Sequence, residues 1–491
     1  MSRRPSSSRI SIHPRSDDKR RKISWLAWAF AVLPIPAGFC AADDRPNIVI
    51  MLCDDLGYGD LGCYGHPHIR TPNLDALAGS GMKMTACYSA APVCSPSRVG
   101  LLTGRSPNRA GVFDWIPEAS RERPDRRDRV HMRDDEVTIA DCLGQAGYQT
   151  AMVGKWHCNS RFNDPAQPQP GDAGFDHWMA TQNNASPSHE NPKNFVRNGD
   201  PVGPLEGYSC QLVMDESLRW LDACDSSRPF FLFAAFHEPH EPVASPPQLV
   251  DRYAGVAESD DQAQYFANVT NVDDAVGRLV DYLDEHSLRD NTLIFFTSDN
   301  GPETLNRYRK ANRSHGSPGP LRGMKLHTTD AGFRVCGIAS WPAEIEAGTI
   351  EDRVFSSLDL MPTLCGLAAA KLPDRELDGI DWARMAEDPD AKRDSPLVWA
   401  YYNALNERRV AMRIGDFKVL AKLDGLGKLQ NVHEGNHDLV RSSELTDFQI
   451  FNVQDDIDED DDLSGSLPYA PRLKQRLIRE YERLLAGSHV W

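Results

Sequence analysis

Four strongly apolar runs of this chain each end abruptly in charged or amide side chains, and this pattern constrains the fold more than any other. The runs are residues 47–52, 150–154, 230–236 and 293–296, and the polar residues that follow them include Asp54, Asp55, Lys155, His157, His237, His240, Asp299 and Asn300. Continuous apolar runs of this length are typical of strands that are buried on both faces. Because ligands bind beyond the carboxyl ends of the strands in open α/β sheets, the pattern predicts one site assembled from distant parts of the sequence.

Helical periodicity between these runs completes the predicted fold class. Apolar residues recur at helical spacing over residues 266–288, and a shorter helical segment is expected at 137–143. Strands that alternate with helices predict an α/β fold, with a large, mixed but mainly parallel sheet flanked by helices. Beyond a polar run at residues 387–394, short apolar stretches with turns predict a small antiparallel α+β subdomain. We therefore expect a main domain at 43–390 and a C-terminal subdomain at 391–491.

The acidic and amide residues at the predicted strand ends suit a hard divalent cation. Asp54, Asp55, Asp299 and Asn300 offer only oxygen ligands, which favours Ca²⁺, with Mg²⁺ as the alternative, over Zn²⁺. Taken alone, the aspartate pair also fits an ordinary turn after a strand.

A second group of residues supplies positive charge or proton transfer. Its members are Arg98, Lys155, His157, His240 and Lys325. Cations and histidines in one site suit the stabilisation of an anionic transition state. Each of them singly is an ordinary solvated or structural residue, so the functional interpretation rests on the set.

The segment Cys94-Ser95-Pro96-Ser97-Arg98, followed by Leu102-Thr103-Gly104-Arg105, is the most specific motif. Proline and short serine side chains suit a turn into a helix. Arg98 would then lie one turn along, where it can neutralise an anion at the helix N-terminus. A buried cysteine in a Ser/Pro turn is the structural alternative for the pentapeptide alone.

Together these motifs resemble the type I formylglycine-dependent sulfatases of the alkaline phosphatase superfamily, over roughly residues 46–345. The landmarks are Arg45-Pro46-Asn47 leading to Asp54-Asp55-Leu56-Gly57-Tyr58-Gly59-Asp60, Thr71-Pro72-Asn73, the Cys94 motif, Gly154-Lys155-Trp156-His157, Pro239-His240-Glu241-Pro242, Thr297-Ser298-Asp299-Asn300-Gly301 and Leu321-Arg322-Gly323-Met324-Lys325. The sequence as a whole, including the segment 111–117, looks similar to bacterial proteins grouped with the N-acetylgalactosamine-6-sulfatases and arylsulfatases. The resemblance implies removal of sulfate from a sulfated glycan, with a 6-O-sulfated hexosamine as a candidate.

The resemblance also implies the chemistry at Cys94. A maturation enzyme would convert Cys94 into formylglycine, whose hydrate attacks sulfur with one hydroxyl while the other later collapses to the aldehyde and expels sulfate. Arg98 and Lys155 would hold the modified side chain, and His157 would help the hemiacetal to eliminate. His240 and Lys325 would bind the sulfate and assist the leaving oxygen.

The same resemblance implies a calcium site. Its ligands would be Asp54, Asp55, Asp299 and Asn300, together with the modified residue 94.

Two departures from the family pattern concern the other catalytic residues. After Lys325 the family usually shows a Glu-Gly-Gly turn, whereas this chain has Asp330-Ala331-Gly332. His237 and His240 both lie near the expected histidine, and the Pro-His-x-Pro context favours His240. Residues 158–210, rich in Asn, Pro, Gly and Ser, are expected to form loops over the site.

Two other functions remain open. A phosphoester hydrolase of the same superfamily would use Ser or Thr with paired metals, and the extra His and Asp ligands are not evident. A glycan-binding pseudoenzyme whose Cys94 is never modified is the alternative from another class. The formal charge of −17 disfavours nucleic acid or an anionic membrane as a partner.

The N-terminus is expected to be a targeting segment. Residues 1–22 are polar and basic, residues 23–35 are apolar, and small residues follow. This order predicts a signal peptide at 1–42 and a secreted or periplasmic protein. The apolar stretch is too short for a stable membrane span, with a retained anchor or lipidation of Cys40 as the alternatives. Most of the eleven cysteines are expected to be free buried thiols.

Overall fold

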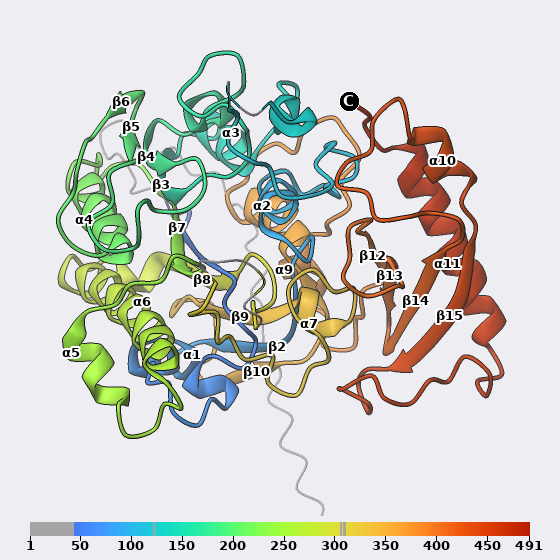
Figure 1. Cartoon of the computed structure of the whole chain (residues 1–491). Helices are drawn as coiled ribbons and strands as arrows, with labels where there is room; N and C mark the ends of the chain where they lie inside the picture. Colours follow the sequence, from blue (N-terminus) through green and yellow to red (C-terminus); the bar gives the residue numbers. More distant parts are fainter. Residues whose placement is uncertain (1–43, 121, 123, 305–306, 308–310) are drawn as a thin grey trace, which may run out of the picture. The chain divides into compact units, whose positions relative to one another are not determined.

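A mixed sheet of eleven strands organises the part of the chain that the computed structural model describes, which is residues 44–120, 122, 124–304, 307 and 311–491 (Figure 1). In spatial order the strands are β10 (Thr349–Glu351), β2 (Met82–Tyr88), β9 (Arg334–Ser340), β8 (Thr292–Ser298), β1 (Asn47–Asp54), β7 (Phe230–Pro239), β3 (Gln149–Lys155), β4 (His177–Thr181), β5 (Val196–Arg197) and β6 (Asp200–Pro201), with β11 (Phe355–Ser356) beside β2. The predicted signal peptide at 1–42 lies outside the described residues.

The centre of this sheet is parallel. β1 pairs in parallel with β7 on one side and β8 on the other, and β3 pairs in parallel with β7 and β4. β9 runs antiparallel to both β2 and β8. The predicted α/β class with a mixed, mainly parallel sheet is therefore confirmed.

Helices cover both faces of the sheet, which explains why its central strands are apolar throughout. Successive side chains of a strand point to opposite faces, and in β1 Ile48, Ile50 and Leu52 pack on one side while Val49 and Met51 pack on the other. The first side is covered by α2 (Cys94–Thr103), α3 (Ile139–Gln145), α8 (Leu360–Leu367) and α9 (Trp382–Ala386), and the second by α1 (Pro72–Gly79), α4 (Ser209–Asp222), α5 (Pro247–Val250) and α6 (Asp260–Glu285).

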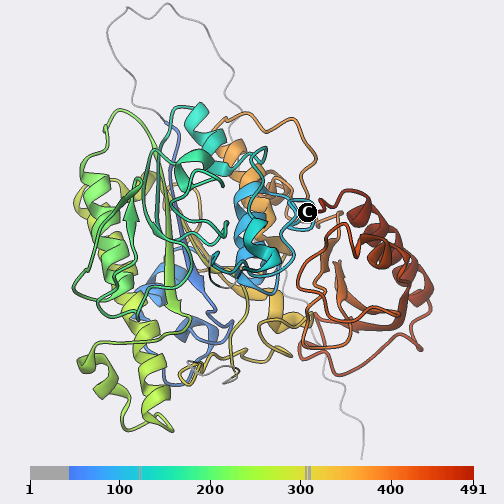
Figure 2. The same ribbon diagram turned by 45° about the horizontal axis from the view of Figure 1, so that its top comes forward.

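A second sheet forms the C-terminal part (Figure 2). Its antiparallel strands are β12 (Leu397–Ala400), β13 (Val410–Ile414), β14 (Phe417–Leu423) and β15 (Leu445–Asn452), accompanied by α10 (His437–Ser442) and α11 (Ala470–Ala486). Leu477 and Tyr481 of α11 pack in one buried cluster with Val410 and Val419 of the sheet. The predicted small antiparallel α+β element is confirmed, and its boundary at residue 390 stays a prediction.

A buried ionic cluster links this second sheet to the main one. Asp330, which begins the short helix α7 (Asp330–Phe333), accepts a hydrogen bond from the Lys418 ammonium of β14 at 2.7 Å and from the Tyr88 hydroxyl at 3.0 Å. Glu459 lies 3.5 Å from the same ammonium, and all three charged side chains are fully buried. The Asp that replaces the expected Glu of the family turn thus anchors the C-terminal sheet.

The segment 158–210 is not loop throughout, because β4, β5 and β6 lie within it and β4 extends the sheet beside β3. Within the described ranges, no helix has the length and apolar character needed to cross a bilayer. The cysteines of these ranges are free thiols, most of them buried, as expected.

Candidate functional site

The ends of four neighbouring strands bring the predicted site residues together. Because β8, β1, β7 and β3 are adjacent and parallel, their carboxyl ends lie at one edge of the sheet. Asp54 and Lys155 are the last residues of β1 and β3, Asp299 directly follows β8, and His240 directly follows β7. The residues predicted from the strand ends therefore lie together at one edge of the sheet.

Alternating charges hold this edge together. The Arg98 guanidinium of α2 donates to Asp299 at 2.8 Å, the Lys155 ammonium donates to Asp54 at 2.5 Å, and the Lys325 ammonium donates to Asp55 at 2.7 Å. These side chains are between 0% and 6% exposed. Charges this well buried are not screened by water, so their interactions are much stronger than at a surface.

Unpaired acceptors at this edge fit a divalent cation. Within the described part of the chain, Asp54 Oδ1 and Asn300 Oδ1 are buried without a hydrogen-bond donor. Ligand atoms of Asp54, Asp55 and His240 lie within 4.8 Å of one another. Since buried polar atoms are nearly always satisfied, such orphaned oxygens call for a ligand, and oxygen donors suit Ca²⁺ or Mg²⁺.

The acid–base balance of the carboxylates points the same way. Burial disfavours the charged form of Asp54, but Lys155 and His240 outweigh it and hold the pKa well below its usual range. Burial and the nearby Asp54 charge raise the pKa of Asp299 to about 7, although Arg98 donates to it. The protein's own cations therefore do not fully compensate the carboxylates, and a bound cation would.

Cys94 begins α2 next to this cluster. The residue is 3% exposed and packs with Tyr401 and Leu326. Burial raises the pKa of its thiol to about 11, although Lys155 and Lys325 act in the opposite direction. The unmodified thiol is therefore protonated at neutral pH, and a protonated thiol is a poor nucleophile.

His157 is positioned as a neutral base. Its φ of 53° is unusual for a non-glycine residue, and its backbone N–H donates to the Gln182 carbonyl at 2.7 Å. The ring Nε2 lies 2.9 Å from the Ile116 carbonyl, which can only accept, so Nε2 carries the hydrogen and Nδ1 keeps its lone pair. Burial, with Lys155 and Arg98, lowers the pKa well below its usual value. Nδ1 is buried and lacks a partner among the described residues.

The structure separates the two candidate histidines. His240 Nε2 lies 3.6 Å from Asp55, and its Nδ1 donates to the Glu241 carbonyl at 2.6 Å. Burial and the neighbouring Lys325 lower the pKa of His240 to about 4. His237 instead makes a 2.8 Å hydrogen bond with Thr181. The geometry therefore favours His240 as the residue that reaches the charged cluster.

Two residues beside the site were not singled out individually from the sequence. Tyr401, which follows β12, belongs to the same buried cluster as Cys94, and its hydroxyl donates to Asp114 at 2.9 Å. Asp114 lies in the distinctive segment 111–117, which was a usable signal. The position of Tyr401 near Asp114 depends on how the C-terminal sheet packs, and no local sequence pattern predicts it.

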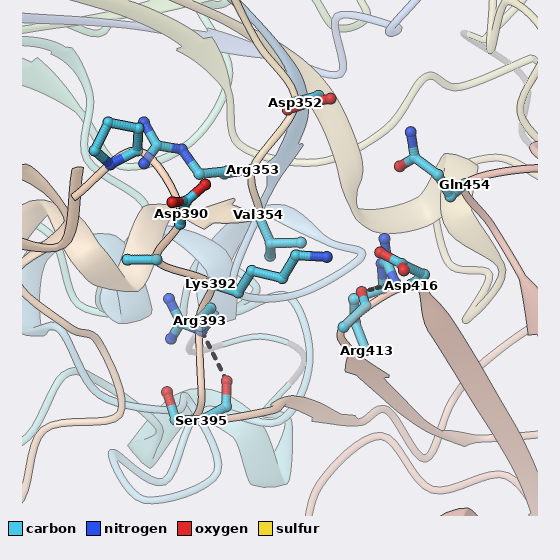
Figure 3. Close-up of a pocket in the computed structure, with 13 residues that line it drawn as sticks. Asp352, Arg353, Val354, Asp390, Lys392, Arg393, Ser395, Arg413, Asp416 and Gln454 are labelled. Atoms are coloured by element: carbon cyan, nitrogen blue, oxygen red, sulfur yellow. Dashed lines mark hydrogen bonds between the residues drawn. The ribbon is translucent and has the colours of Figure 1, made fainter.

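A separate cavity of about 400 Å³ lies between the loop after β10 and the β13–β14 hairpin (Figure 3). Its arginines are engaged in the protein: Arg393 donates to the Ser395 carbonyl at 3.0 Å and to Asp359, and Arg353 pairs with Glu351. None of the predicted catalytic residues lines this cavity, so the strand-end cluster remains the candidate active site.

Comparison with known proteins identifies the family of this chain. The family model described as Sulfatase matches residues 46–370. Arylsulfatase A of Homo sapiens is 35% identical over 381 residues, which cover 71% of this chain and 69% of that protein. N-acetylgalactosamine-6-sulfatase of Homo sapiens is 34% identical over 361 residues, which cover 70% of this chain and 66% of that protein.

Solved structures are similar over nearly the whole chain. The crystal structure of Ps i-CgsB in complex with k-i-k-neocarrahexaose has a TM-score of 0.75 at 28% identity, and covers 91% of this chain and 94% of that one. The PsFucS1 sulfatase from Pseudoalteromonas sp. has a TM-score of 0.71 at 25% identity, with 90% and 91% covered. The chain therefore belongs to the sulfatase family, the enzymes that hydrolyse sulfate esters.

Proposed function

We propose that this enzyme removes sulfate from a sulfated glycan through a formylglycine made from Cys94, with a 6-O-sulfated hexosamine as the first candidate substrate. The observation that carries the proposal is the position of Cys94. Its side chain is buried at the N-terminus of α2, where Lys155 and Lys325 act to lower the pKa of the thiol and an anion would be stabilised. Such a position suits a sulfate-binding nucleophile and not an ordinary thiol.

The modified side chain would supply two hydroxyls on one carbon, one for attack on sulfur and one for later release of sulfate. Arg98 and Lys155 would hold it, and a 2.8 Å hydrogen bond from the Arg98 guanidinium to the Lys155 carbonyl, which fixes the two residues relative to each other, supports this assignment. Oriented cations of this kind lower the energy of a transition state in which negative charge develops.

A calcium ion, or Mg²⁺ as the alternative, would be held by Asp54, Asp55, Asp299, Asn300 and the modified residue 94. Bound there, the cation would polarise the sulfate and the attacking hydroxyl as a Lewis acid. The orphaned oxygens of Asp54 and Asn300 support this ligand set.

Proton transfer is assigned to the histidines and Lys325. The free Nδ1 of His157 is suited to take the proton from a hydroxyl on residue 94 as that side chain returns to its aldehyde. Lys325 and His240 lie on the Asp55 side, where the leaving oxygen would depart. Burial disfavours the charged form of Lys325, but the negative charge of Asp55 outweighs it and holds the pKa of the ammonium well above its usual value. A sulfate ester bound beside His240 would favour protonation of its ring.

The glycan assignment draws on the relatives. One is an N-acetylgalactosamine-6-sulfatase, and one structural neighbour is a complex with a neocarrahexaose. The basic N-terminal segment followed by an apolar run supports secretion or a periplasmic location. A formylglycine-generating maturation enzyme would then be the partner on which activity depends.

Mass spectrometry of the Cys94 peptide tests the proposal. Active enzyme should carry an aldehyde or its hydrate at residue 94, and Cys94→Ala should abolish hydrolysis of every sulfate ester while the protein remains folded. Cys365→Ala is a matched control, since that buried thiol lies in α8 away from the strand-end cluster. Finding only thiol at residue 94 in active, natively produced enzyme would refute the mechanism.

A further inference from the structure

A buried carboxylate beside residue 94 has no part in the mechanism above. Asp114 is 3% exposed, and its Oδ1 accepts from the Trp115 backbone and from the Tyr401 hydroxyl, both at 2.9 Å. Its Oδ2 accepts from the Asn403 amide at 2.9 Å. All three donors are neutral groups, so they orient the carboxylate without cancelling its charge.

Asp114 is nevertheless charged at neutral pH. Burial raises its pKa to about 6, and the three hydrogen bonds limit that rise more than the positive charge of Arg127 does. Arg127 is instead stacked on the Trp115 ring, 4.5 Å from its centroid. The Asp114 carboxylate is thus a negative charge near a site suited to anions, and its hydrogen-bond donors are all neutral groups.

Contacts place this carboxylate in the wall next to the nucleophile. Tyr401, its hydrogen-bond donor, belongs to the same buried cluster as Cys94. Two residues further along the same segment, the Ile116 backbone N–H donates to Ser95 Oγ at 2.9 Å, and the Ile116 carbonyl accepts from His157. The segment 114–116 therefore lies against both the nucleophile's helix and the proposed base.

The C-terminal part contributes the other half of this wall. The Leu405 backbone N–H donates to the Leu326 carbonyl at 2.9 Å, next to Lys325, and the Leu326 N–H donates to the Pro92 carbonyl at 2.8 Å. These bonds hold the turn that carries Asn403 between the loops of residue 94 and Lys325. Asn403 is only partly buried, in contrast to Asp114.

A negative charge at Asp114 would distinguish substrates by the charge of the group that lies next to it. Carboxylate and amide oxygens accept hydrogen bonds from hydroxyl and amide N–H groups. Like charges repel strongly where water is excluded, so a second sulfate or a carboxylate on the substrate would be disfavoured there. Building repulsion against the wrong ligand is a general route to specificity.

We propose that Asp114, oriented by Tyr401 and Asn403, is a specificity residue that accepts a hydrogen bond from an uncharged group of the sulfated sugar and excludes sugars with a second anionic group at that position. This inference rests on the proposed glycan sulfatase function. It narrows the substrate class to sugars that carry one sulfate with a hydroxyl or amide beside it.

The test compares three probes in the matured enzyme: a 6-O-sulfated N-acetylhexosamine, its disulfated forms, and an aryl sulfate. In Asp114→Asn, which keeps the shape and removes the charge, the ratio of kcat/KM for a disulfated form over the monosulfated form should rise about tenfold, as the loss of a nearby unit charge in a partly solvated site implies. Asp438→Asn, at an exposed position of α10, should leave the ratio unchanged.

A second variant separates the orientation of Asp114 from its charge. Asn403→Ala removes one of the three donors that orient Asp114 but leaves the carboxylate in place, so the ratio should stay closer to that of the unaltered enzyme than the ratio of Asp114→Asn does. If Asp114→Asn hydrolyses the aryl sulfate and keeps the ratio of the unaltered enzyme, the inference is overturned and the proposed sulfatase mechanism stays intact. An unaltered, matured enzyme that hydrolyses none of the three probes would overturn both.

Discussion

The buried lysine that joins the two sheets allows a sharp stability prediction. Lys418→Met keeps the length and apolar stem of the side chain but leaves Asp330 and Glu459 buried without their shared cation. Removing one partner of a buried ion pair costs about 3–5 kcal/mol. Arg334 remains 3.4 Å from Asp330, so we expect the lower end, about 3 kcal/mol, in the free energy of unfolding.

The same strand offers a matched control. Lys422 of β14 also pairs with two acidic residues, Glu407 and Asp447, but at the protein surface, where solvent screens such pairs. Urea unfolding followed by tryptophan fluorescence, at one fixed calcium concentration, should therefore show a large loss for Lys418→Met and little for Lys422→Met. Equal changes in the two variants would show that burial does not set the strength of the Lys418 cluster.

Three further outcomes follow from the site. Chelation should remove activity and Ca²⁺ or Mg²⁺ should restore it, because the carboxylates repel one another without a cation. Asp299→Ala should show the same loss, and full activity in protein that elemental analysis finds free of metal would contradict this prediction. His240→Ala and Lys325→Ala should each lower kcat about a hundredfold on a sugar sulfate. The loss should be smaller on an aryl sulfate, because its leaving group needs little protonation. Equal losses on both substrates would exclude a role of these residues at the leaving group. In His157→Ala, intact mass after a first turnover should show one sulfuryl group retained on residue 94, and its absence would exclude the proposed base.

The central strands were predictable because their burial leaves a direct trace in the sequence. β1, β7 and β8 are covered on both faces, and each reads as a continuous apolar run. β2 and β15 have no such trace, since polar residues such as Lys83 and Asp447 interrupt them. Their identity as strands comes from their neighbours in the sheet.

In the candidate site, too, some contacts could be predicted from the sequence and others could not. Asp54 and Asp299 lie together because adjacent parallel strands end at one edge, a consequence that follows from strand order alone. Asp114 and Tyr401 meet only because the C-terminal sheet packs against the loop of residue 94. Such a contact depends on the tertiary arrangement, so the sequence pattern predicted that the strand-end residues lie together but did not predict the contacts of Asp114 and Tyr401 beside them.

The burial of Cys94 has a consequence for the order of events during biosynthesis. In the folded protein its side chain is 3% exposed and belongs to one buried cluster with Tyr401, a residue that leaves the ribosome long after Cys94. In the proposed mechanism a maturation enzyme must reach the thiol itself, so it would have to act before the C-terminal part closes over the turn. Chains that fold first would keep an unmodified thiol, and the yield of active enzyme would then depend on whether modification or folding is faster.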